Sequence, residues 1–125
     1  MIVGTGIDLA EVGRIQRSIE RFGERFLARV YTLAERAYVD RKKNRFERYA
    51  ARFAAKEAAM KAIGTGWKQG VTWRDIEVTN LPSGKPTLRF SGKAAEFAER
   101  LGVRSVALSL SHTEELAIAE VILEN

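Results

Sequence analysis

The stretch NRFERYAARFAAKEAAMKAIG, residues Asn44–Gly64, decides the fold, because it predicts one long helix that the rest of the chain must cover. Asn44 and Glu47 form a capping-box pattern that starts a helix, and Gly64 supplies the residue that ends one. We therefore expect a helix over about Arg45–Ile63. Its apolar content predicts close packing on most sides, since alanine occupies positions 54, 55, 58, 59 and 62.

The chain before this helix predicts a strand that carries an aspartate. Residues Ile2–Leu9 alternate as a buried strand does, with Gly4, Gly6 and Asp8 sharing one face. Two glycines on that face leave room where another group could approach. Asp8 therefore stands beside open space in the predicted structure.

Two shorter helices are predicted between this strand and the long helix. Residues Glu11–Phe22 are amphipathic, and Gly23 is expected to break or bend the helix that they form. The segment from Thr32 to about Lys42 opens with a capping box formed by Thr32 and Glu35. The first helix has an apolar stripe of Val12, Ile15, Ile19 and Phe22 and a basic ridge of Arg14, Arg17, Arg21 and Arg25.

The second half of the chain is richer in strand patterns. The expected elements are a strand over Trp73–Thr79, a turn over Asn80–Pro86, a strand over Thr87–Phe90, a helix over Gly92–Leu101, and strands over Ser105–Leu110 and Leu116–Leu123. Residues Ser111–Glu115 are expected to form a hairpin loop between the last two strands. The predicted class is α+β, with a mostly antiparallel sheet packed against the long helix.

Composition narrows the class of protein. The chain has 125 residues, which predicts a single domain over 1–125. It has no cysteine, which excludes a disulfide framework and is compatible with the cytoplasm. We see no export signal and no apolar run that could cross a membrane. The net charge is +5, but the segment from Arg14 to Lys61 carries +8, which indicates an acidic or phosphate-bearing partner.

Asp8 has two interpretations from its sequence position. It could be a metal-binding carboxylate at the end of a strand. It could also cap the following helix, because Asp8 and Glu11 have capping-box spacing. The capping pattern is the more common origin of such a pair, and the two roles are compatible.

Glu57 and Lys61 also have two interpretations. They lie four residues apart on one helix face, an order that favours an intrahelical ion pair of about 0.2–0.5 kcal/mol. The surrounding alanines suggest instead that Glu57 is partly buried. A partly buried carboxylate with an ammonium one turn away suits a metal and a phosphate together, so both interpretations stay open.

Further polar residues could hold phosphate. A basic cluster spans the start of the long helix, formed by Arg41, Lys42, Lys43, Arg45, Arg48 and Arg52. Such clusters are usually solvated, although a helix N-terminus can also bind phosphate. His112 is the only histidine, so a histidine-based metal site is nearly excluded, but its side chain could donate to a phosphate.

Several motifs in order resemble one enzyme family. Residues 6–15 (GIDLAEVGRI) and 52–66 (RFAAKEAAMKAIGTG) resemble the two main motifs of bacterial holo-acyl-carrier-protein synthases, which are 4′-phosphopantetheinyl transferases. The shorter motifs WRDIEV (73–78), GKP (84–86) and LSHT (110–113) follow in the family's order. The resemblance covers nearly the whole chain, and it implies the phosphopantetheinyl transferase fold.

This resemblance implies an activity and its residues. The family transfers the 4′-phosphopantetheine arm of coenzyme A to a serine of apo acyl carrier protein, for lipid and fatty acid biosynthesis, and releases adenosine 3′,5′-bisphosphate. Asp8 and Glu57 match its Mg²⁺ ligands, and Lys61 matches its active-site lysine. Either carboxylate, directly or through a metal-bound water, could accept the serine proton. Residues matched to coenzyme A binding are Arg45, Arg52, Lys61 and His112.

The resemblance also implies partners. Arg14, Arg21 and Arg25 correspond to the helix that docks the acidic carrier protein. The family is known for homotrimers with active sites between subunits. Neither nucleic acid nor a membrane is an expected partner.

Two non-catalytic functions compete with this one. A small basic RNA- or nucleotide-binding protein would explain the +8 segment. However, Phe22, Phe26, Phe46 and Phe53 fall at core-like helical positions rather than on an exposed stacking surface. An interaction module that uses only the arginine ridge would leave Asp8, Glu57 and Lys61 as caps and ion pairs.

Overall fold

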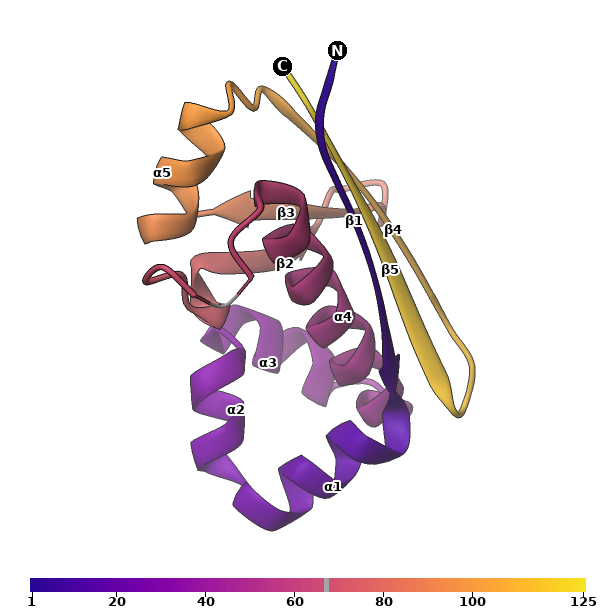
Figure 1. The fold of residues 1–125 in the computed structure, drawn as a ribbon. Coiled ribbons are helices and arrows are strands. Elements are labelled where there is room, and N and C mark those ends of the chain that lie inside the picture. Colours follow the sequence, from indigo (N-terminus) through magenta and orange to yellow (C-terminus); the bar gives the residue numbers. More distant parts are fainter. Residues whose placement is uncertain (67) are drawn as a thin grey trace.

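The computed structural model describes residues 1–66 and 68–125, and its central element is α4 (Arg45–Ile63). Figure 1 shows this helix running along a three-stranded sheet. The other elements are β1 (Ile2–Glu11), α1 (Val12–Phe22), α2 (Glu24–Val30), α3 (Leu33–Asp40), the 3₁₀ turn η1 (Trp73–Asp75), β2 (Ile76–Asn80), β3 (Pro86–Phe90), α5 (Gly92–Arg100), β4 (Ser105–His112) and β5 (Leu116–Glu124). The expected α+β fold with antiparallel strands is confirmed.

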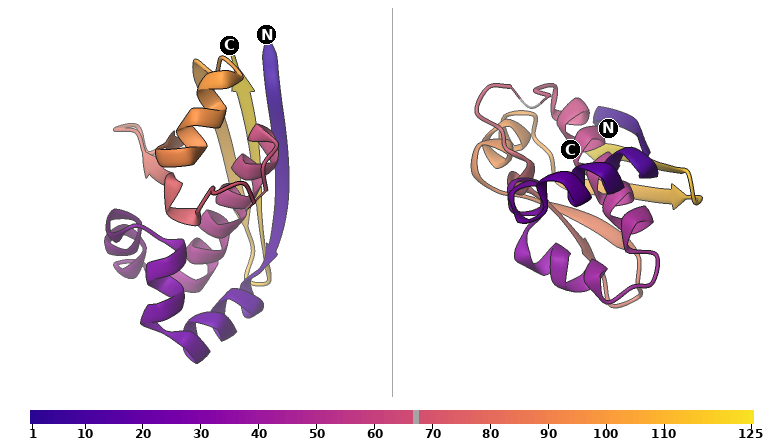
Figure 2. Two further views of the ribbon diagram at one scale, coloured as in Figure 1. Left: turned by 60° about the vertical axis from the view of Figure 1, so that its left-hand side comes forward. Right: turned by 90° about the horizontal axis from the view of Figure 1, so that it is seen from below.

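Two antiparallel sheets lie around α4. The larger has the order β1-β5-β4, and α4 packs against all three of its strands. The smaller is the β2–β3 hairpin, which contacts α4 through β2 and β4 through β3. The two further views in Figure 2 show α4 between the larger sheet and the remaining helices. The chain ends lie side by side, and the Asn125 amide donates to the Met1 carbonyl at 3.0 Å.

The alanines of α4 allow the close packing that the sequence predicted. The side chains at positions 54, 55, 58 and 59 are fully buried. Gly64 ends the helix in the left-handed conformation, with φ of 81°, which glycine adopts without strain. The predicted bounds of this helix are confirmed at both ends.

The glycine face of β1 is occupied by the backbone of α4. A Cβ atom on Gly6 would lie 1.8 Å from the Ala58 carbonyl oxygen. The opposite face of β1 is open, with Ile7 56% and Leu9 58% exposed. The expectation of a fully buried strand is therefore wrong for one face, and the space beside the glycines is filled by a helix.

The start of α1 differs from the capping interpretation. β1 continues to Glu11, and Glu11 itself is the N-cap residue, without a side-chain capping bond. Asp8 therefore stays within the strand, and the interpretation of Asp8 as a helix cap is wrong. Gly23, with φ of 53°, separates α1 from α2 as expected. Phe22 is 49% exposed and does not belong to the core.

The two other capping predictions have different outcomes. Thr32 and Glu35 form the predicted capping box. Asn44 does precede α4, but its side chain accepts from Arg48 Nε at 2.9 Å and gives no cap. Glu47, the other member of that predicted box, contacts His112 instead.

The strand predictions of the second half are correct in type and inexact in extent. Trp73–Asp75 form η1, and only the residues from Ile76 onward join β2. β4 continues to His112, so this histidine ends a strand and does not lie in the hairpin loop. None of the helices in the described ranges combines the length and apolar character that a membrane crossing requires.

Candidate active site

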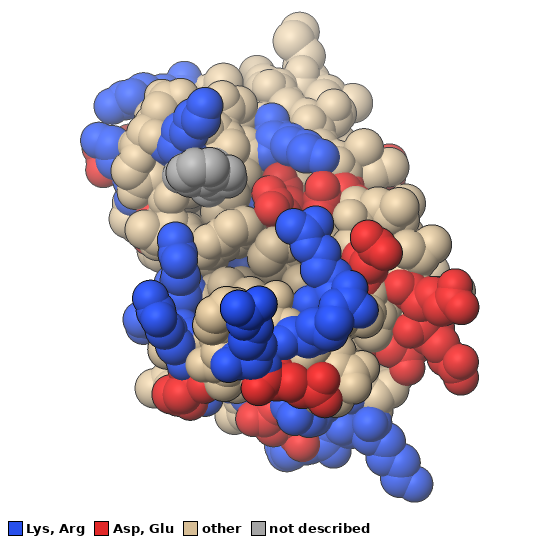
Figure 3. Space-filling model, turned by 60° about the horizontal axis from the view of Figure 1, so that its bottom comes forward, with Lys and Arg blue, Asp and Glu red and all other residues tan. Residues whose placement is uncertain are grey.

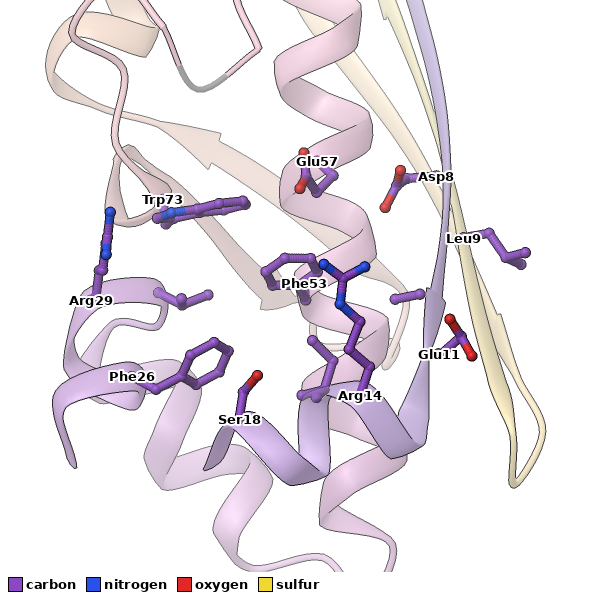
Figure 4. A pocket seen from close by; sticks show the side chains of 13 residues that line it. Asp8, Leu9, Glu11, Arg14, Ser18, Phe26, Arg29, Phe53, Glu57 and Trp73 are labelled. Atoms are coloured by element: carbon purple, nitrogen blue, oxygen red, sulfur yellow. The ribbon is translucent and has the colours of Figure 1, made fainter. Parts of the chain in front are cut away.

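A cavity of about 560 Å³ opens between β1, α1, α2, α4 and η1. Its lining divides into two parts, as the close-up in Figure 4 shows. The polar part includes Asp8, Glu11, Arg14 and Glu57, and the aromatic part includes Phe26, Phe53 and Trp73. We call this cavity the carboxylate pocket. A partly enclosed cavity with a few convergent polar groups is typical of small-molecule binding.

The close contact of β1 with α4 brings the two carboxylates to one pocket. Gly6 allows the strand to touch the helix backbone at Ala58, one residue after Glu57. Asp8 lies on the same strand face as Gly6, because side chains alternate along a strand. Asp8 and Glu57, almost fifty residues apart in the sequence, therefore both line the pocket.

The electrostatic environment of Glu57 indicates a site built for a cation. Desolvation by burial raises the pKa of its carboxyl group, and the negative charge of Asp8 raises it further. The positive charges of Lys61 and Arg14 act in the opposite direction. A carboxylate whose pKa is raised by burial and by a neighbouring carboxylate is stabilised in its charged form by a nearby positive ion.

Lys61 pairs with Asp8 and not with Glu57. Its Nζ donates to Asp8 Oδ1 at 3.0 Å and to the Ile7 carbonyl at 3.0 Å. The interpretation of Glu57 and Lys61 as an intrahelical ion pair is therefore wrong. Within the described part of the chain, no donor lies within hydrogen-bonding distance of the Glu57 carboxylate, which leaves it free for a ligand.

The donor set fits a hard divalent cation. Mg²⁺ is usually held by one or two carboxylates, with water and substrate phosphates completing an octahedral shell. Among the described residues, no group of three or more His, Cys, Asp or Glu side chains is placed to hold a metal ion, so an ion bound here would have at most these two carboxylates as protein ligands. Such a site leaves coordination positions for a phosphate-bearing substrate. A softer ion would require the sulfur or nitrogen ligands that the pocket lacks.

The aromatic wall was not assigned from the sequence. Trp73 stacks on Phe53 with a centroid separation of 4.9 Å and an interplanar angle of 25°. Phe53 could have been placed, because it lies four residues before Glu57 and shares its helix face. Trp73 comes from a distant segment, and Ser18, Phe26 and Arg29 come from other elements. No local pattern connects these side chains to Glu57.

The arginine ridge lies on the face formed by α1 and α2. Arg14 lines the carboxylate pocket, and Arg17, Arg21 and Arg25 are exposed. Figure 3, which views the molecule from this end, shows Lys and Arg side chains spread across the surface with acidic groups between them. The ridge therefore connects the pocket with the outer surface of the molecule.

None of the four residues that the resemblance assigned to coenzyme A is part of this pocket's lining, and Lys61 reaches it only through its hydrogen bond to Asp8. Arg45 lies 3.7 Å from Asp40 in an ion pair. His112 Nδ1 lies 3.0 Å from Glu47 Oε1, near the start of α4. Glu47 and Glu57 are ten residues apart, which is about 15 Å along a helix. One chain therefore does not bring His112 beside the two carboxylates.

Arg52 is more buried than a solvated cation would be. It is 4% exposed, its guanidinium lies 4.6 Å from the centroid of the Tyr38 ring, and Nη2 donates to Asn80 Oδ1 at 3.2 Å. Its Nε is buried and has no hydrogen-bond partner among the described residues. Desolvation lowers the pKa of Arg52, so burial of its charged guanidinium costs free energy.

Comparisons with known proteins agree on one family. The model of the 4′-phosphopantetheinyl transferase superfamily matches residues 4–119. Two holo-[acyl-carrier-protein] synthases, from Solibacter usitatus and Koribacter versatilis, are 68% and 62% identical to this chain, with all of both chains covered in each case.

Solved structures of the same kind are similar in fold. A holo-[acyl-carrier-protein] synthase from Neisseria meningitidis has a TM-score of 0.89 at 36% identity, with both chains fully covered. A synthase from Bacillus anthracis in complex with CoA (3′,5′-ADP) has a TM-score of 0.80 at 41% identity, covering 98% of this chain and 96% of that one. A Helicobacter pylori synthase in complex with coenzyme A has a TM-score of 0.84 at 29% identity, covering 96% and 99%.

Proposed function

The chain belongs to the 4′-phosphopantetheinyl transferase superfamily, and from this premise we propose that the carboxylate pocket is its active site, with Asp8 and Glu57 in its lining and Lys61 beside it, bonded to Asp8, as the central residues. The chain is an enzyme that transfers the 4′-phosphopantetheine group of coenzyme A to a serine of apo acyl carrier protein. Adenosine 3′,5′-bisphosphate is the leaving product. The two non-catalytic functions considered from the sequence are therefore set aside.

The observation that carries the site assignment is the unpaired carboxylate of Glu57 beside Asp8. We infer that Asp8 and Glu57 hold Mg²⁺, since two adjacent carboxylates in a half-buried pocket repel each other unless a cation is present. A bound Mg²⁺ would supply charge neutralisation and orientation for the pyrophosphate of coenzyme A. Lys61 donates a hydrogen bond to one oxygen of Asp8, which restricts the orientation of that carboxylate.

Side chains of the protein supply charge stabilisation, a proton acceptor and the exclusion of water during the transfer. A bond forms between the serine oxygen and the pantetheine-side phosphorus, and the bond from that phosphorus to the adenosine bisphosphate oxygen breaks. Arg14 and Lys61 stabilise negative charge on the transferring and leaving oxygens. We assign the serine proton to the Glu57 carboxylate, because Asp8 is already engaged by Lys61. Phe26, Phe53 and Trp73 exclude water from one side of the pocket.

Docking of the carrier protein is assigned to the arginine ridge. Arg21 and Arg25 are exposed on the surface next to the pocket that Arg14 lines. An acidic protein would be attracted and oriented there, so that its serine enters beside Glu57. We also propose a cytoplasmic location, which the absence of cysteine in the sequence suits.

We further propose a homotrimer in which neighbouring subunits complete each active site. The outer face of the larger sheet exposes Ile7, Leu9, Leu116 and Ile118. Leu9 and Ile118 are paired across the two strands, and an exposed apolar patch of this kind favours burial against another copy. Across such an interface, Arg45, Arg52 and His112 of one subunit would reach the coenzyme A held by the carboxylate pocket of the next.

Intact-mass spectrometry tests the reaction and the metal together. Apo acyl carrier protein is incubated with the enzyme, coenzyme A and Mg²⁺, with a parallel sample that contains chelator. We expect a mass gain of one phosphopantetheine arm that chelator abolishes and added Mg²⁺ restores. Glu57→Gln should slow transfer by about 10³-fold while the enzyme stays folded, because an oriented carboxylate at the reacting centre is lost. Unchanged transfer by this variant would refute the assignment of Glu57.

Mixing two inactive variants tests the shared site. Glu57→Gln subunits and His112→Ala subunits are unfolded and refolded together, and transfer is measured against each variant refolded alone. Mixed trimers contain some interfaces with both native residues, so activity should reappear. A monomer in solution, or no recovered activity in confirmed mixed trimers, would contradict the proposal.

A further inference from the structure

A buried ion pair lies next to the active site without belonging to its chemistry. Lys56 Nζ is 2.8 Å from Glu35 Oε1, and both side chains are 0% exposed. Among the ion pairs of the described residues, no other has both side chains fully buried. Lys56 immediately precedes Glu57 in the sequence, but it points away from the carboxylate pocket into the interior of the protein.

Every donor of the Lys56 ammonium group is used. Besides Glu35, Nζ donates to the Trp73 carbonyl at 3.1 Å and to the Ile76 carbonyl at 2.5 Å. An ammonium group has three donors, so these contacts satisfy it completely. Trp73 is the first residue of η1 and Ile76 is the residue after it, so Lys56 ties both ends of this turn to α4.

Glu35 connects the pair to the start of α3 and to β2, the strand that follows this turn. Its Oε1 accepts from the Thr32 amide at 2.8 Å, and its Oε2 accepts from the Val78 amide at 2.8 Å. The pair thus joins α3, α4, η1 and β2. These contacts leave few ways for η1 to shift relative to the helix that carries Glu57.

The turn held in this way carries the aromatic wall of the pocket. Lys56 holds the Trp73 backbone, and Phe53, three residues earlier on α4, holds the Trp73 ring by stacking. Figure 4 shows Trp73 and Asp8 on opposite sides of Glu57. The position of η1 therefore sets the distance between the aromatic wall and the carboxylates.

Stability alone does not explain the pair. Desolvation lowers the pKa of Lys56, so burial of the ammonium has a cost. Replacing a buried ion pair by uncharged groups of similar volume is often neutral or stabilising. An apolar replacement could not supply the directional hydrogen bonds that this pair makes to three separate segments.

We propose that the Lys56–Glu35 pair positions the Trp73 wall so that the pocket fits the pantetheine arm of coenzyme A. This inference rests on the proposed function of the pocket. Lys56 and Glu35 are positioning residues, because neither lines the cavity. The arm combines methyl groups with amides, and it suits an aromatic wall beside the site that holds the pyrophosphate.

Steady-state kinetics of the double variant Lys56→Met/Glu35→Gln test the proposal. Both charges are removed together, so neither is left buried and alone. We expect KM for coenzyme A to rise about tenfold, with kcat and the KM for carrier protein within about twofold of the parent. The matched control is Tyr49→Phe, which removes another contact of α4, the partly buried 2.7 Å hydrogen bond from Tyr49 to Asp40. The control should leave both KM values unchanged.

Fluorescence gives a readout independent of activity. The chain has two tryptophans, Trp67 and Trp73, so all proteins carry Trp67→Phe and report on Trp73 alone. Acrylamide should quench Trp73 more strongly in the double variant than in the parent or the Tyr49→Phe control. Stronger quenching would show a displaced wall even in a protein that transfers nothing.

The outcomes separate this inference from the proposed function. An inactive parent enzyme would refute the function, and the quenching comparison would still decide whether the pair holds Trp73. A folded double variant with unchanged KM for coenzyme A, or a rise only in the KM for carrier protein, would overturn the inference. If the double variant does not fold, Trp73→Leu replaces it. An unchanged KM for coenzyme A in that variant would be equally decisive against the inference.

Discussion

Two lysines of α4, five residues apart, have opposite surroundings although both pair with a carboxylate from another segment. Lys56 and its partner Glu35 are fully buried, and every donor of the ammonium is used. Lys61 is 53% exposed and its partner Asp8 18% exposed, beside the unpaired Glu57. The buried pair holds the structure around the pocket, whereas the exposed pair remains available to a substrate. The same kind of lysine–carboxylate pair thus holds the structure where it is buried and is available to a substrate where it is exposed.

Removing the buried lysine alone should have the largest effect on stability. Lys56→Met leaves the Glu35 carboxylate buried without its cation, which should lower the free energy of unfolding by about 3–5 kcal/mol. Urea denaturation followed by circular dichroism measures the change. The double variant with Glu35→Gln should recover most of the loss. A single variant as stable as the parent would show that the pair is not electrostatically coupled.

Removing the exposed lysine should reduce activity strongly and stability only slightly. Lys61→Met should reduce kcat/KM by about 10²–10³-fold, because a cation near the reacting phosphate is lost. Its unfolding free energy should change by less than about 1 kcal/mol, as is usual for partly exposed ion pairs. Transfer assays and urea denaturation on the same preparation separate the two effects. A large loss of stability would remove the distinction between the two lysines.

The close approach of β1 to α4 at Gly6 holds Asp8, the partner of the exposed lysine, in its position beside Glu57. Gly6→Ala places a Cβ atom against the Ala58 carbonyl, and relief of this clash should cost about 1–3 kcal/mol of stability. The strand must also move, so transfer should fall because Asp8 leaves its place beside Glu57. Thermal unfolding and the transfer assay measure these effects.

Gly13→Ala is the control for this substitution. Its new Cβ would meet only the end of the Arg17 side chain, at 3.2 Å, at an exposed position of α1. The control should keep its activity and gain up to about 1 kcal/mol of stability, because alanine is the better helix residue. Equal losses in Gly6→Ala and Gly13→Ala would contradict the account of the β1 contact.

Removing the charge of Glu77, a partly buried carboxylate, should have the smallest effect on stability, and this effect should disappear at acidic pH. The Thr32 hydroxyl, followed by Arg89, lowers the pKa of Glu77. A lowered folded-state pKa gives stability that is present above the unfolded-state pKa and lost as the pH falls through the folded-state pKa. Glu77→Gln should therefore be about 1 kcal/mol less stable than the parent at pH 7, and the difference should vanish under strongly acidic conditions. A difference independent of pH would indicate lost packing rather than lost charge.

The extent of α4 was predictable because its signals are local. Alanine-rich sequence favours a helix, and Gly64 ends it through its own backbone freedom. The capping box of Thr32 and Glu35 was predictable for the same reason. Asp8 shows the limit of local patterns, since its spacing to Glu11 suited a cap but the longer β1 strand kept it in the sheet.

The sequence by itself determined the α+β class, the long central helix and, through its resemblance to a known family, the two carboxylates and the lysine proposed for the active site. Only the tertiary structure decided that Lys56 is buried and Lys61 accessible, that Lys61 pairs with Asp8, and that Trp73 joins Phe53 in the wall of the pocket. The physical reason is the range of the interactions. Helix formation depends on neighbours within a few residues, whereas the partners of Lys56 and Lys61 come from segments that meet only when the sheet and η1 pack against α4.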